Sequence, residues 1–520
     1  MGLMPFKNEP FTDYSNEANR KAQEDAIKRV RKEWLGLDHP LYIGGKEVKT
    51  GKFLERWNPG KTDELVGRIH MGGQKHAGMA VDAAVKAFES WRKVPAAARA
   101  RYLLRAAQVI RKNKFDWNAF LMFEAGKSWP EADGDIAEAI DFLEFYARRM
   151  MEIDQPHPTS PWPGEENNVY WMPMGVGLSI PPWNFPLAIA VGMTTAMMVA
   201  GNPVVLKANS KSPIIAALIG KLFRELDLPP GVLNVVAGPA SEIGDYLVDH
   251  PKVRLVSFTG SKQVGCRIYE RAAKVNPGQR WLKRVVAEMG GKDAILVDES
   301  ADLEKAAEAI VVAAFGYQGQ KCSACSRAII HKKVHDEVLE MVIERTKKLK
   351  VGPAWEQSTN VACVIDPSAY DSIMGYIAHG KKENELVCGG KAAEVKGHKG
   401  YYIQPTVFSS VKPGHRIHCE EIFGPVLAVL SCRNFEDGLQ IVNSSEYALT
   451  GSAFSNKREH LELARSDFAA GNLYLNRKCT GALVDVQPFG GFNMSGTDDK
   501  AGGREHLYRF LQAKTVCERL

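Results

Sequence analysis

The residues best suited to covalent chemistry form a short run around Cys322. Lys321 precedes the cysteine, Ser323 follows it, and glycines at 316 and 319 let the backbone approach a ligand closely. A buried structural cysteine usually lies in apolar, periodic sequence, whereas Cys322 has polar neighbours. A lysine beside a thiol favours the thiolate, which is the reactive form. The run therefore predicts a nucleophilic cysteine; the alternative is a glycine-rich loop that ends a helix.

Two polar side chains that could assist a nucleophile follow predicted strands. Asn184 lies in the run 182–186, before a helix N-terminus, where an amide donor can stabilise a developing oxyanion. It could equally cap that helix. Glu288 ends another predicted strand beside the glycines at 290 and 291. A carboxylate in a partly apolar cleft can act as a general base, and the alternative is an exposed strand-end glutamate.

Three further positions could hold a nucleotide. Lys207 ends a predicted strand and can reach ribose hydroxyls or a phosphate. Residues 258–261, with Gly265 beyond, form a strand, a turn and a helix start, which brings a pyrophosphate near helix amides. This is not the GxGxxG fingerprint, so the motif alone is weak. Glu421 lies in a carboxylate pair before an aromatic residue and could accept hydrogen bonds from a ribose. Each of these also fits an ordinary loop or surface charge.

The elements that must position these residues alternate between short apolar strands and amphipathic helices. Between Val176 and Glu288 the pattern predicts five strands, at 177–180, 203–207, 232–236, 253–258 and 284–288. This alternation indicates βαβ units and a parallel sheet, whose ligands bind at the carboxyl ends of the strands. A second α/β series begins at 294–297. The fold class is therefore predicted to be α/β.

Helices and a projecting arm are predicted around this core. Residues 154–166 are rich in Pro, Ser and Gly and cannot be helical, and a strand follows at 168–172, so the region reads as a connection or a hairpin arm. The tail, 498–520, alternates polar and apolar residues and could add an edge strand to a partner. Helices are expected at 17–34, 77–91, 97–112, 115–124 and 135–150.

Composition excludes several classes of protein. A net charge of +6 over 520 residues, without a dense basic run, argues against nucleic-acid binding. Nine cysteines, an odd number scattered along the chain, argue against a disulfide framework or a zinc site and for a reducing compartment. The first ten residues lack a signal core. The apolar run 186–206 is broken by Gly201, Asn202 and Pro203, so it predicts a helix, a turn and a strand and not a membrane span. A cytoplasmic protein is expected.

In combination the motifs resemble the aldehyde dehydrogenase superfamily over nearly the whole chain. They are, in order, Pro182–Pro186, Phe258–Ser261, Glu288–Lys292, Gly319–Ser323 and Glu420–Pro425. The resemblance implies a Rossmann-type NAD(P)-binding domain, an α/β catalytic domain and a β oligomerisation arm. Their implied bounds are 1–153 with 175–287, then 288–485, and 154–174 with 486–520.

The resemblance also implies a role for each motif. Cys322 would be the nucleophile, Glu288 the base, and Asn184 with the Cys322 backbone N–H the oxyanion hole. A homodimer or a higher homo-oligomer is implied. The residues implied to contact the cofactor are Ile180, Pro181, Trp183, Lys207, Ser210, Gly260, Ser261, Gly265, Glu421 and Phe423.

Segments 315–327, 137–142 and 476–491 are similar to a narrower branch of the superfamily. That branch oxidises L-glutamate γ-semialdehyde, the open form of 1-pyrroline-5-carboxylate, to L-glutamate in proline catabolism. A proline dehydrogenase partner is conceivable on that basis. The branch implies that Ser323 and the amides of Gly481 and Ala482 hold the substrate carboxylate, since hydrogen-bond donors suit that group. Its other implied substrate residues are Glu138, Phe185, Lys321 and Phe489.

One departure from the superfamily pattern concerns the cofactor. The usual strand-end motif is Lys-Pro-x-Glu, whose glutamate would bind the adenosine ribose, but here residues 207–210 read Lys-Ala-Asn-Ser. Loss of the carboxylate removes repulsion against a 2′-phosphate, so NADP is expected to be accepted beside NAD.

Three other functions fit parts of the pattern. The chain could act on another semialdehyde, such as succinate semialdehyde. It could transfer an acyl group to CoA, although Glu288 favours hydrolysis. It could also be a dinucleotide-binding protein without activity, against which the intact set of Cys322, Glu288 and Asn184 argues.

Overall fold

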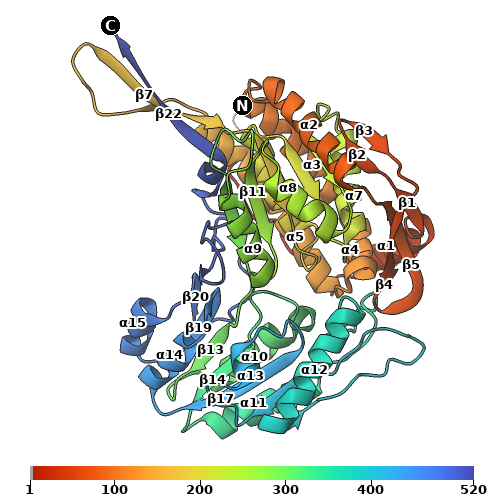
Figure 1. Ribbon diagram of the computed structural model, residues 1–520. Helices are drawn as coiled ribbons and strands as arrows, with labels where there is room; N and C mark the ends of the chain where they lie inside the picture. The colour runs from red at the N-terminus through yellow and green to blue at the C-terminus, as the bar shows by residue number, and fades with distance from the viewer. Residues whose placement is uncertain (1–3) are drawn as a thin grey trace.

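Two seven-stranded sheets organise the chain in a computed structural model that describes residues 4–520. Figure 1 shows them as an upper and a lower body, with a two-stranded arm projecting from the upper one. The predicted α/β class is confirmed. Residues 1–3, which begin the predicted NAD(P)-binding domain, lie outside the described residues.

The first sheet has the order β12-β11-β8-β9-β10-β2-β3. Its first five strands run parallel, and β2 and β3 add an antiparallel edge. All four residues of β9 and of β10 are buried, as is typical of strands covered on both faces. The strands are β2 (Leu41–Ile43), β3 (Lys46–Val48), β8 (Val176–Ile180), β9 (Val204–Lys207), β10 (Leu233–Val236), β11 (Val253–Thr259) and β12 (Arg284–Glu288).

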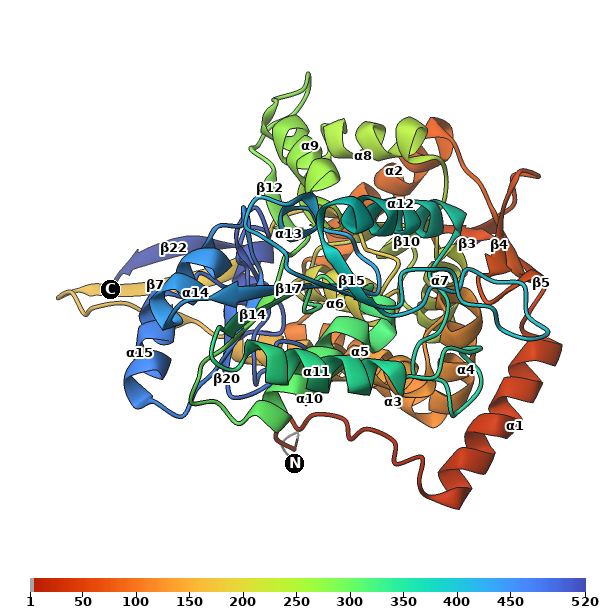
Figure 2. The same cartoon turned by 90° about the horizontal axis from the view of Figure 1, so that it is seen from below.

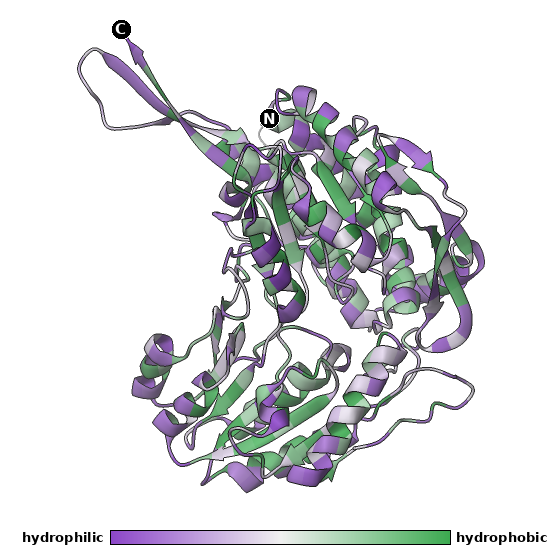
Figure 3. Ribbon diagram, viewed as in Figure 1, coloured by the Kyte–Doolittle hydropathy of each residue, from purple (hydrophilic) through white to green (hydrophobic). Residues whose placement is uncertain are grey.

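Helices from two parts of the chain cover this sheet, and Figure 3 shows the apolar strands lying between amphipathic helices. The N-terminal helices are α1 (Glu17–Glu33), α2 (Gln74–Trp91), α3 (Ala96–Lys112), α4 (Lys114–Ala125) and α5 (Trp129–Ile153). The crossover helices are α6 (Ala188–Val199), α7 (Pro213–Glu225), α8 (Asp245–Asp249), which the π-turn Ala240–Gly244 precedes, and α9 (Lys262–Ala273). A small sheet of β1 (Leu37–His39), β5 (Lys61–His70) and β4 (Phe53–Asn58) flanks them.

The second sheet has the order β15-β16-β17-β14-β13-β19-β20 and is parallel except for β15. Alternate residues of β13 enter two different cores: Leu296 packs with Ile373 of α12, whereas Ile295 packs with Ile310 of α10. Figure 2 accordingly shows α12 on one side of the strands and α10 with α11 on the other. The strands are β13 (Ala294–Val297), β14 (Arg327–His331), β15 (Glu385–Cys388), β16 (Thr406–Ser409), β17 (Val426–Cys432), β19 (Thr450–Phe454) and β20 (Asn472–Leu475).

The helices of this body are α10 (Leu303–Phe315), α11 (His335–Lys347), α12 (Pro367–Glu383), α13 (Arg416–Cys419), α14 (Phe435–Asn443) and α15 (Arg458–Asp467). The short strands β18 (Tyr447–Ala448) and β21 (Phe492–Asn493) pair beside it.

The link between the sheets determines how they face each other. The chain leaves β12 at Glu288 and enters β13 at Ala294. It therefore passes from the carboxyl edge of the first sheet to the amino edge of the second. The parallel register places Thr259 beside Glu288 and Phe258 beside Ile180, so the polar strand ends form one row. The Cys322 loop, which precedes β14, lies at the opposing edge.

The arm is built from β7 (Glu165–Pro173) and β22 (Leu511–Arg519), with β6 (His157–Pro158) along β7. The pairing is antiparallel, from Leu511 opposite Pro173 to Arg519 opposite Glu165. The tail was predicted to be able to add an edge strand to a partner; β22 pairs with β7 of its own chain and is the outer strand of that sheet, so the prediction stands untested. The segment 486–510, which precedes β22, contains β21, which pairs with β18, and Gly496, which bridges to Glu288.

Candidate active site

A strained turn places the Cys322 loop between the two bodies. Helix α10 ends at Phe315, and Tyr317 (φ 48°) and Gln318 (φ 57°) in the following 3₁₀ turn (Gly316–Gly319) are left-handed. Such a conformation costs a non-glycine residue roughly 1–2 kcal/mol. Hydrogen bonds to the end of α4 hold it, because Tyr317 Oη donates to the Ala125 carbonyl (2.8 Å) and Gln318 Nε2 to that of Gly126 (3.0 Å).

Asn184 is fixed beside this loop. The side chain is 4% exposed, and its Nδ2 donates to the carbonyl of Gln320 at 3.0 Å. Gln320 is itself held, since its side-chain oxygen accepts from the Ile365 amide at 2.9 Å. A carboxamide has two N–H donors, so one fixes the side chain and the second is available to an oxyanion on a group attached to Cys322.

Glu288 is the last residue of β12, and its carboxyl is buried. Neither oxygen has a hydrogen-bond partner among residues 4–520. Burial, followed by the charges of Asp499 and Asp498, raises the pKa of Glu288 well above its ordinary value, while Lys500 lowers it. A desolvated carboxylate binds a proton more strongly than one in water, which is what a general base requires.

The electrostatic prediction for Cys322 is wrong. Lys321 was expected to favour the thiolate, but its ammonium pairs with Glu131 at 2.7 Å. Burial raises the pKa of the Cys322 thiol, and so do the surrounding carboxyls, of which Asp293 and Glu421 act most strongly. Because Glu131 neutralises the charge of Lys321, the fact that Lys321 precedes Cys322 in the sequence did not predict the electrostatic environment of the thiol. This environment disfavours the thiolate, so the proton of Cys322 must leave before attack.

The strand ends of the first sheet form a cradle suited to a nucleotide. Lys207 is 7% exposed, and its ammonium has one hydrogen bond, to the Ala208 carbonyl at 3.3 Å. Burial lowers its pKa to about 8. Beyond Ile180 the chain continues through Pro181, whose carbonyl accepts from Asn209 at 3.3 Å, so these two strand ends are tied together.

Helix α9 offers its first amides at the same edge. Gly260 N donates to the Glu288 carbonyl (3.0 Å), and Ser261 occupies the N-cap position. A Cβ at Gly265 would lie 2.4 Å from Met289 Sδ, so only glycine lets the helix approach β12 this closely. A helix start with free amides suits a pyrophosphate.

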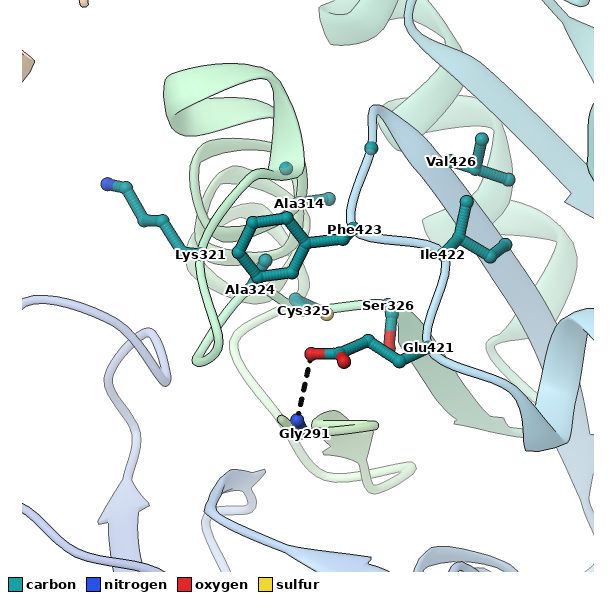
Figure 4. Close-up of a pocket in the computed structure, with 12 residues that line it drawn as sticks. Gly291, Ala314, Lys321, Ala324, Cys325, Ser326, Glu421, Ile422, Phe423 and Val426 are labelled. Carbon is teal, nitrogen blue, oxygen red and sulfur yellow. Dashed lines mark hydrogen bonds between the residues drawn. The ribbon is translucent and has the colours of Figure 1, made fainter. Parts of the chain in front are cut away.

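Glu421 lies across the glycines that follow Glu288. Figure 4 shows its carboxylate accepting a hydrogen bond from the Gly291 amide, at 3.1 Å. Burial raises its pKa to about 7. Phe423, in a left-handed conformation (φ 55°), packs edge to face on Trp183, with ring centroids 5.4 Å apart. These groups suit a dinucleotide. Lys207 and Glu421 can bond its two ribose diols, the first amides of α9 can bind its pyrophosphate, and Phe423 and Trp183 can pack beside it. The structure provides no comparable contact for Ser210.

Aromatic and charged side chains line the loop on its other side. The ring of Phe185 packs edge to face on Tyr317 at 6.5 Å, and Lys127 lies with its ammonium 3.9 Å from the centre of the Phe185 ring. Lys127 is fully buried and 3.2 Å from the equally buried Asp135. Burial raises the pKa of Glu138 to about 8.

Sequence reasoning missed Lys127 and Asp135. The acidic residues of the predicted helix 135–150 were a usable signal. An acid on a helix that is buried on both sides needs a partner of opposite charge, and Lys127 is a lysine close to that helix in the sequence.

The residues of the predicted carboxylate clamp come from two neighbouring loops. The carbonyl of Ser323 accepts from Thr450 Oγ1 (3.4 Å) and contacts Cys479 Sγ (3.5 Å), so Ser323 adjoins the loop that leads to Gly481. Gly481 is left-handed (φ 79°). Ala482 follows it in the same loop, and Phe489 is held by paired backbone hydrogen bonds to Ala501.

The described residues provide neither a metal site nor a membrane-spanning helix. Between positions 4 and 520 no three His, Cys, Asp or Glu side chains are grouped so that they could hold a metal ion. Over the same residues, no helix combines the length and the apolar character needed to cross a bilayer.

Comparison with known proteins gives consistent matches along the chain. The model of the aldehyde dehydrogenase family matches residues 46–516. A 1-pyrroline-5-carboxylate dehydrogenase of Geobacillus sp. (strain WCH70) is 53% identical over 516 residues, 99% of this chain and 99% of the relative.

Solved structures agree with the sequence relatives. A 1-pyrroline-5-carboxylate dehydrogenase from Thermus with bound NAD is 46% identical, with a TM-score of 0.97 and full coverage of both chains. Proline utilization A from Bdellovibrio bacteriovorus is 40% identical with a TM-score of 0.97; the match covers all of this chain and 54% of that one.

Proposed function

Because the chain belongs to the aldehyde dehydrogenase family, we propose that it oxidises L-glutamate γ-semialdehyde to L-glutamate with NAD, the second step of proline catabolism. The observation that carries this function is the end-to-end likeness to 1-pyrroline-5-carboxylate dehydrogenases, which leaves no part of the chain unmatched in their fold. The chain is an NAD-dependent aldehyde dehydrogenase, and its substrate is the open form of 1-pyrroline-5-carboxylate.

In the proposed mechanism the S–H bond of Cys322 breaks, its proton passes to a water molecule, and the sulfur adds to the aldehyde carbon. The carbonyl oxygen becomes an alkoxide, which the free N–H of Asn184 and the backbone N–H of Cys322 stabilise. One such donor is worth about 2.7–4 kcal/mol of transition-state stabilisation. NAD, which Lys207 and Glu421 would hold, would supply the hydride acceptor for this carbon.

The chain's own residues then complete the reaction. Loss of the hydride leaves a thioester on Cys322. The Glu288 carboxylate takes a proton from water, the oxygen of that water adds to the thioester carbon, and the carbon–sulfur bond breaks. Glutamate leaves and the thiol is restored. The buried, unpartnered carboxyl of Glu288 supports this assignment.

The remaining site roles extend the proposal. Lys207 and Glu421 hold the cofactor riboses, with Phe423 and Trp183 beside them, and the start of α9 faces the pyrophosphate. NADP is accepted beside NAD, because Ser210 stands where a glutamate would repel a 2′-phosphate. Ser323 and the amides of Gly481 and Ala482 hold the substrate carboxylate.

We also propose the assembly and location of the enzyme. The β7–β22 arm would mediate a homodimer or a higher homo-oligomer, because paired strands that leave the body bury little surface in one chain. The boundaries 154–174 and 486–520 for the arm remain a proposal, as do those of the two domains. A proline dehydrogenase partner and a cytoplasmic location complete it.

A panel of semialdehydes tests the function. Reduction of NAD would be followed with L-glutamate γ-semialdehyde, succinate semialdehyde and a simple aliphatic aldehyde, with and without CoA. The proposal predicts the highest kcat/KM for the first, unaffected by CoA, and one L-glutamate per NADH. A higher kcat/KM for succinate semialdehyde would show that this aldehyde is the substrate. Dependence on CoA would show that the acyl group is transferred to CoA and not to water.

A further inference from the structure

The Glu288 carboxyl must return one proton to solvent in every turnover if it takes that proton from the attacking water. Both oxygens are buried and without a partner among the described residues, so direct exchange with bulk water is not available to them. The question is which group lies between this carboxyl and the surface. The inference below rests on the proposed role of Glu288.

One point in the structure brings Glu288 next to a partly exposed acid. A Cβ placed on Gly490 would lie 3.2 Å from Glu288 Oε1 and 3.2 Å from Asp498 Oδ1. The two oxygens therefore face the same small space and are no further apart than two hydrogen bonds placed end to end. A single water molecule can span such a separation. Only the missing side chain at position 490 leaves this space open.

Asp498 also reaches solvent. Its side chain is 33% exposed although Oδ1 is buried, so solvent reaches the carboxylate at Oδ2. Oδ1 lies 2.8 Å from the ammonium of Lys500, which is 28% exposed. Lys500 is anchored by hydrogen bonds from Nζ to the carbonyls of Gly471 (2.7 Å) and Gly490 (2.9 Å). The lysine thus holds the Asp498 carboxylate beside the space that Gly490 leaves open.

The neighbouring Asp499 is already engaged. One of its oxygens pairs with Arg509 Nε at 2.6 Å, and the other accepts from Thr497. It is 7% exposed, and its backbone carbonyl is bonded to His506. Both aspartates raise the pKa of Glu288, but only Asp498 combines proximity with access to water.

We propose that Asp498 carries the proton released from Glu288 to solvent, directly or through one water beside Gly490. In this step the O–H bond of protonated Glu288 breaks and an O–H bond forms on the Asp498 carboxylate. That proton then passes to bulk water, and no electrons are gained or lost. Asp498 is a positioning and proton-transfer residue, since it does not contact the substrate.

Asp498→Asn tests this step, because it removes the proton acceptor and keeps the shape and the left-handed backbone (φ 52°) that Asn tolerates. The thioester should still form, so a full burst of about one NADH per subunit should appear. Turnover after the burst should fall about tenfold, a share of the rate that a general base supplies. Imidazole, a small soluble base, should restore it.

A matched control and a second variant separate this role from structure. Asp485 is also left-handed (φ 60°) and paired at the surface, with Arg504 at 3.4 Å, so Asp485→Asn should behave as wild type. Gly490→Ala places a methyl group between Glu288 and Asp498 without altering any charge, and it should slow turnover after an intact burst. Thermal unfolding of each variant would be recorded alongside.

Each outcome either supports or overturns the inference. A full burst, slow turnover and rescue by imidazole in Asp498→Asn support the inference. Wild-type turnover in that variant overturns it, and so does a slow variant with a reduced burst and no rescue. Glu288→Gln decides the remaining case: if it stalls after the burst while Asp498→Asn is normal, this inference fails and the proposed function stands. If Glu288→Gln turns over normally, Glu288 is not the base and this inference falls with that role, whereas the panel of semialdehydes still decides the proposed function.

Discussion

At the scale of single residues, the account depends on three side chains whose environments the fold sets. Asn184 is oriented by Gln320, Glu288 is stripped of partners, and Cys322 is surrounded by carboxyls. The sequence was sufficient to select these residues. It could not give the sign of the field at Cys322, because Glu131, which neutralises Lys321, lies 190 positions earlier in the chain.

The raised pKa of Cys322 predicts how the thiol responds to pH. A thiol whose pKa is raised is protonated below that pKa, so its reaction with iodoacetamide should accelerate steadily from pH 7 to pH 10. Rates would be read by mass spectrometry of the peptide that contains Cys322, which separates it from the other cysteines. A rate that levels off near pH 7 would mean that a low-pKa thiolate is present.

Asn184→Ala should lower kcat by roughly 10²–10³-fold, as the loss of one oxyanion donor does elsewhere. Affinity for NAD should change little, because the side chain is bonded to the Cys322 loop and not to the cradle. Stopped-flow NADH formation and quenching of tryptophan fluorescence by NAD would measure the two effects. An unchanged kcat would remove Asn184 from the oxyanion hole.

At the scale of elements, the strands between 176 and 288 could be predicted from sequence because they are short, apolar and buried on both faces. Strand β5 was missed because it lies in a small, half-exposed sheet where polar residues interrupt the pattern. The arm could be placed only approximately: composition identified 154–166, but pairing between β7 and β22 joins positions over 300 residues apart.

The start of α7 depends on a buried acid from another helix. Glu124 accepts from the Ile214 and Ile215 amides (2.7 and 3.0 Å), and Arg56 donates to the Glu124 carbonyl at 3.0 Å. Glu124→Ala should destabilise the protein by about 3 kcal/mol or more, because two buried amides lose their acceptor and the buried Arg56 loses a nearby negative charge, although its bond to the backbone carbonyl remains.

Thermal unfolding at one scan rate would measure this effect, with Glu225→Ala as control, because Glu225 lies exposed at the other end of the same helix. Equal midpoints for the two variants would show that Glu124 does not stabilise α7.

The turn before Cys322 should affect kcat, because it positions the cysteine. Gln318 makes hydrogen bonds to Gly126, Cys363 and Ala362 that offset its left-handed backbone. Gln318→Ala removes them and leaves the strain, so kcat should fall at least about tenfold while KM for NAD is unchanged. A loss confined to thermal stability, with normal kcat, would mean that the turn does not position the cysteine.

At the scale of the whole molecule, the two sheets meet with the carboxyl edge of one against the amino edge of the other. The short link between β12 and β13 enforces this arrangement and carries Glu288 at its start. It brings the nucleotide cradle of one body to the reactive loop of the other, so a hydride donor and its acceptor can meet between them.

The cofactor cradle predicts dual specificity. NADP should support turnover, and Ser210→Glu should suppress NADP relative to NAD by about tenfold or more, because a carboxylate would face the 2′-phosphate. The ratio of kcat/KM values for the two cofactors measures this directly. A background rate with NADP in the unmodified enzyme would reject the prediction.

Removal of residues 511–520 should dissociate the assembly, because it deletes the strand that pairs with β7 along the arm. Sedimentation velocity of the full and shortened chains would report the change in mass. An assembly of unaltered size in the shortened chain would place the subunit contact elsewhere.

The most direct test of the central claim is the chemical state of Cys322 in Glu288→Gln after mixing with L-glutamate γ-semialdehyde and NAD. The account predicts a burst of about one NADH per subunit, little further turnover, and a glutamyl thioester on the peptide that carries Cys322. Steady turnover with an unmodified cysteine would contradict it.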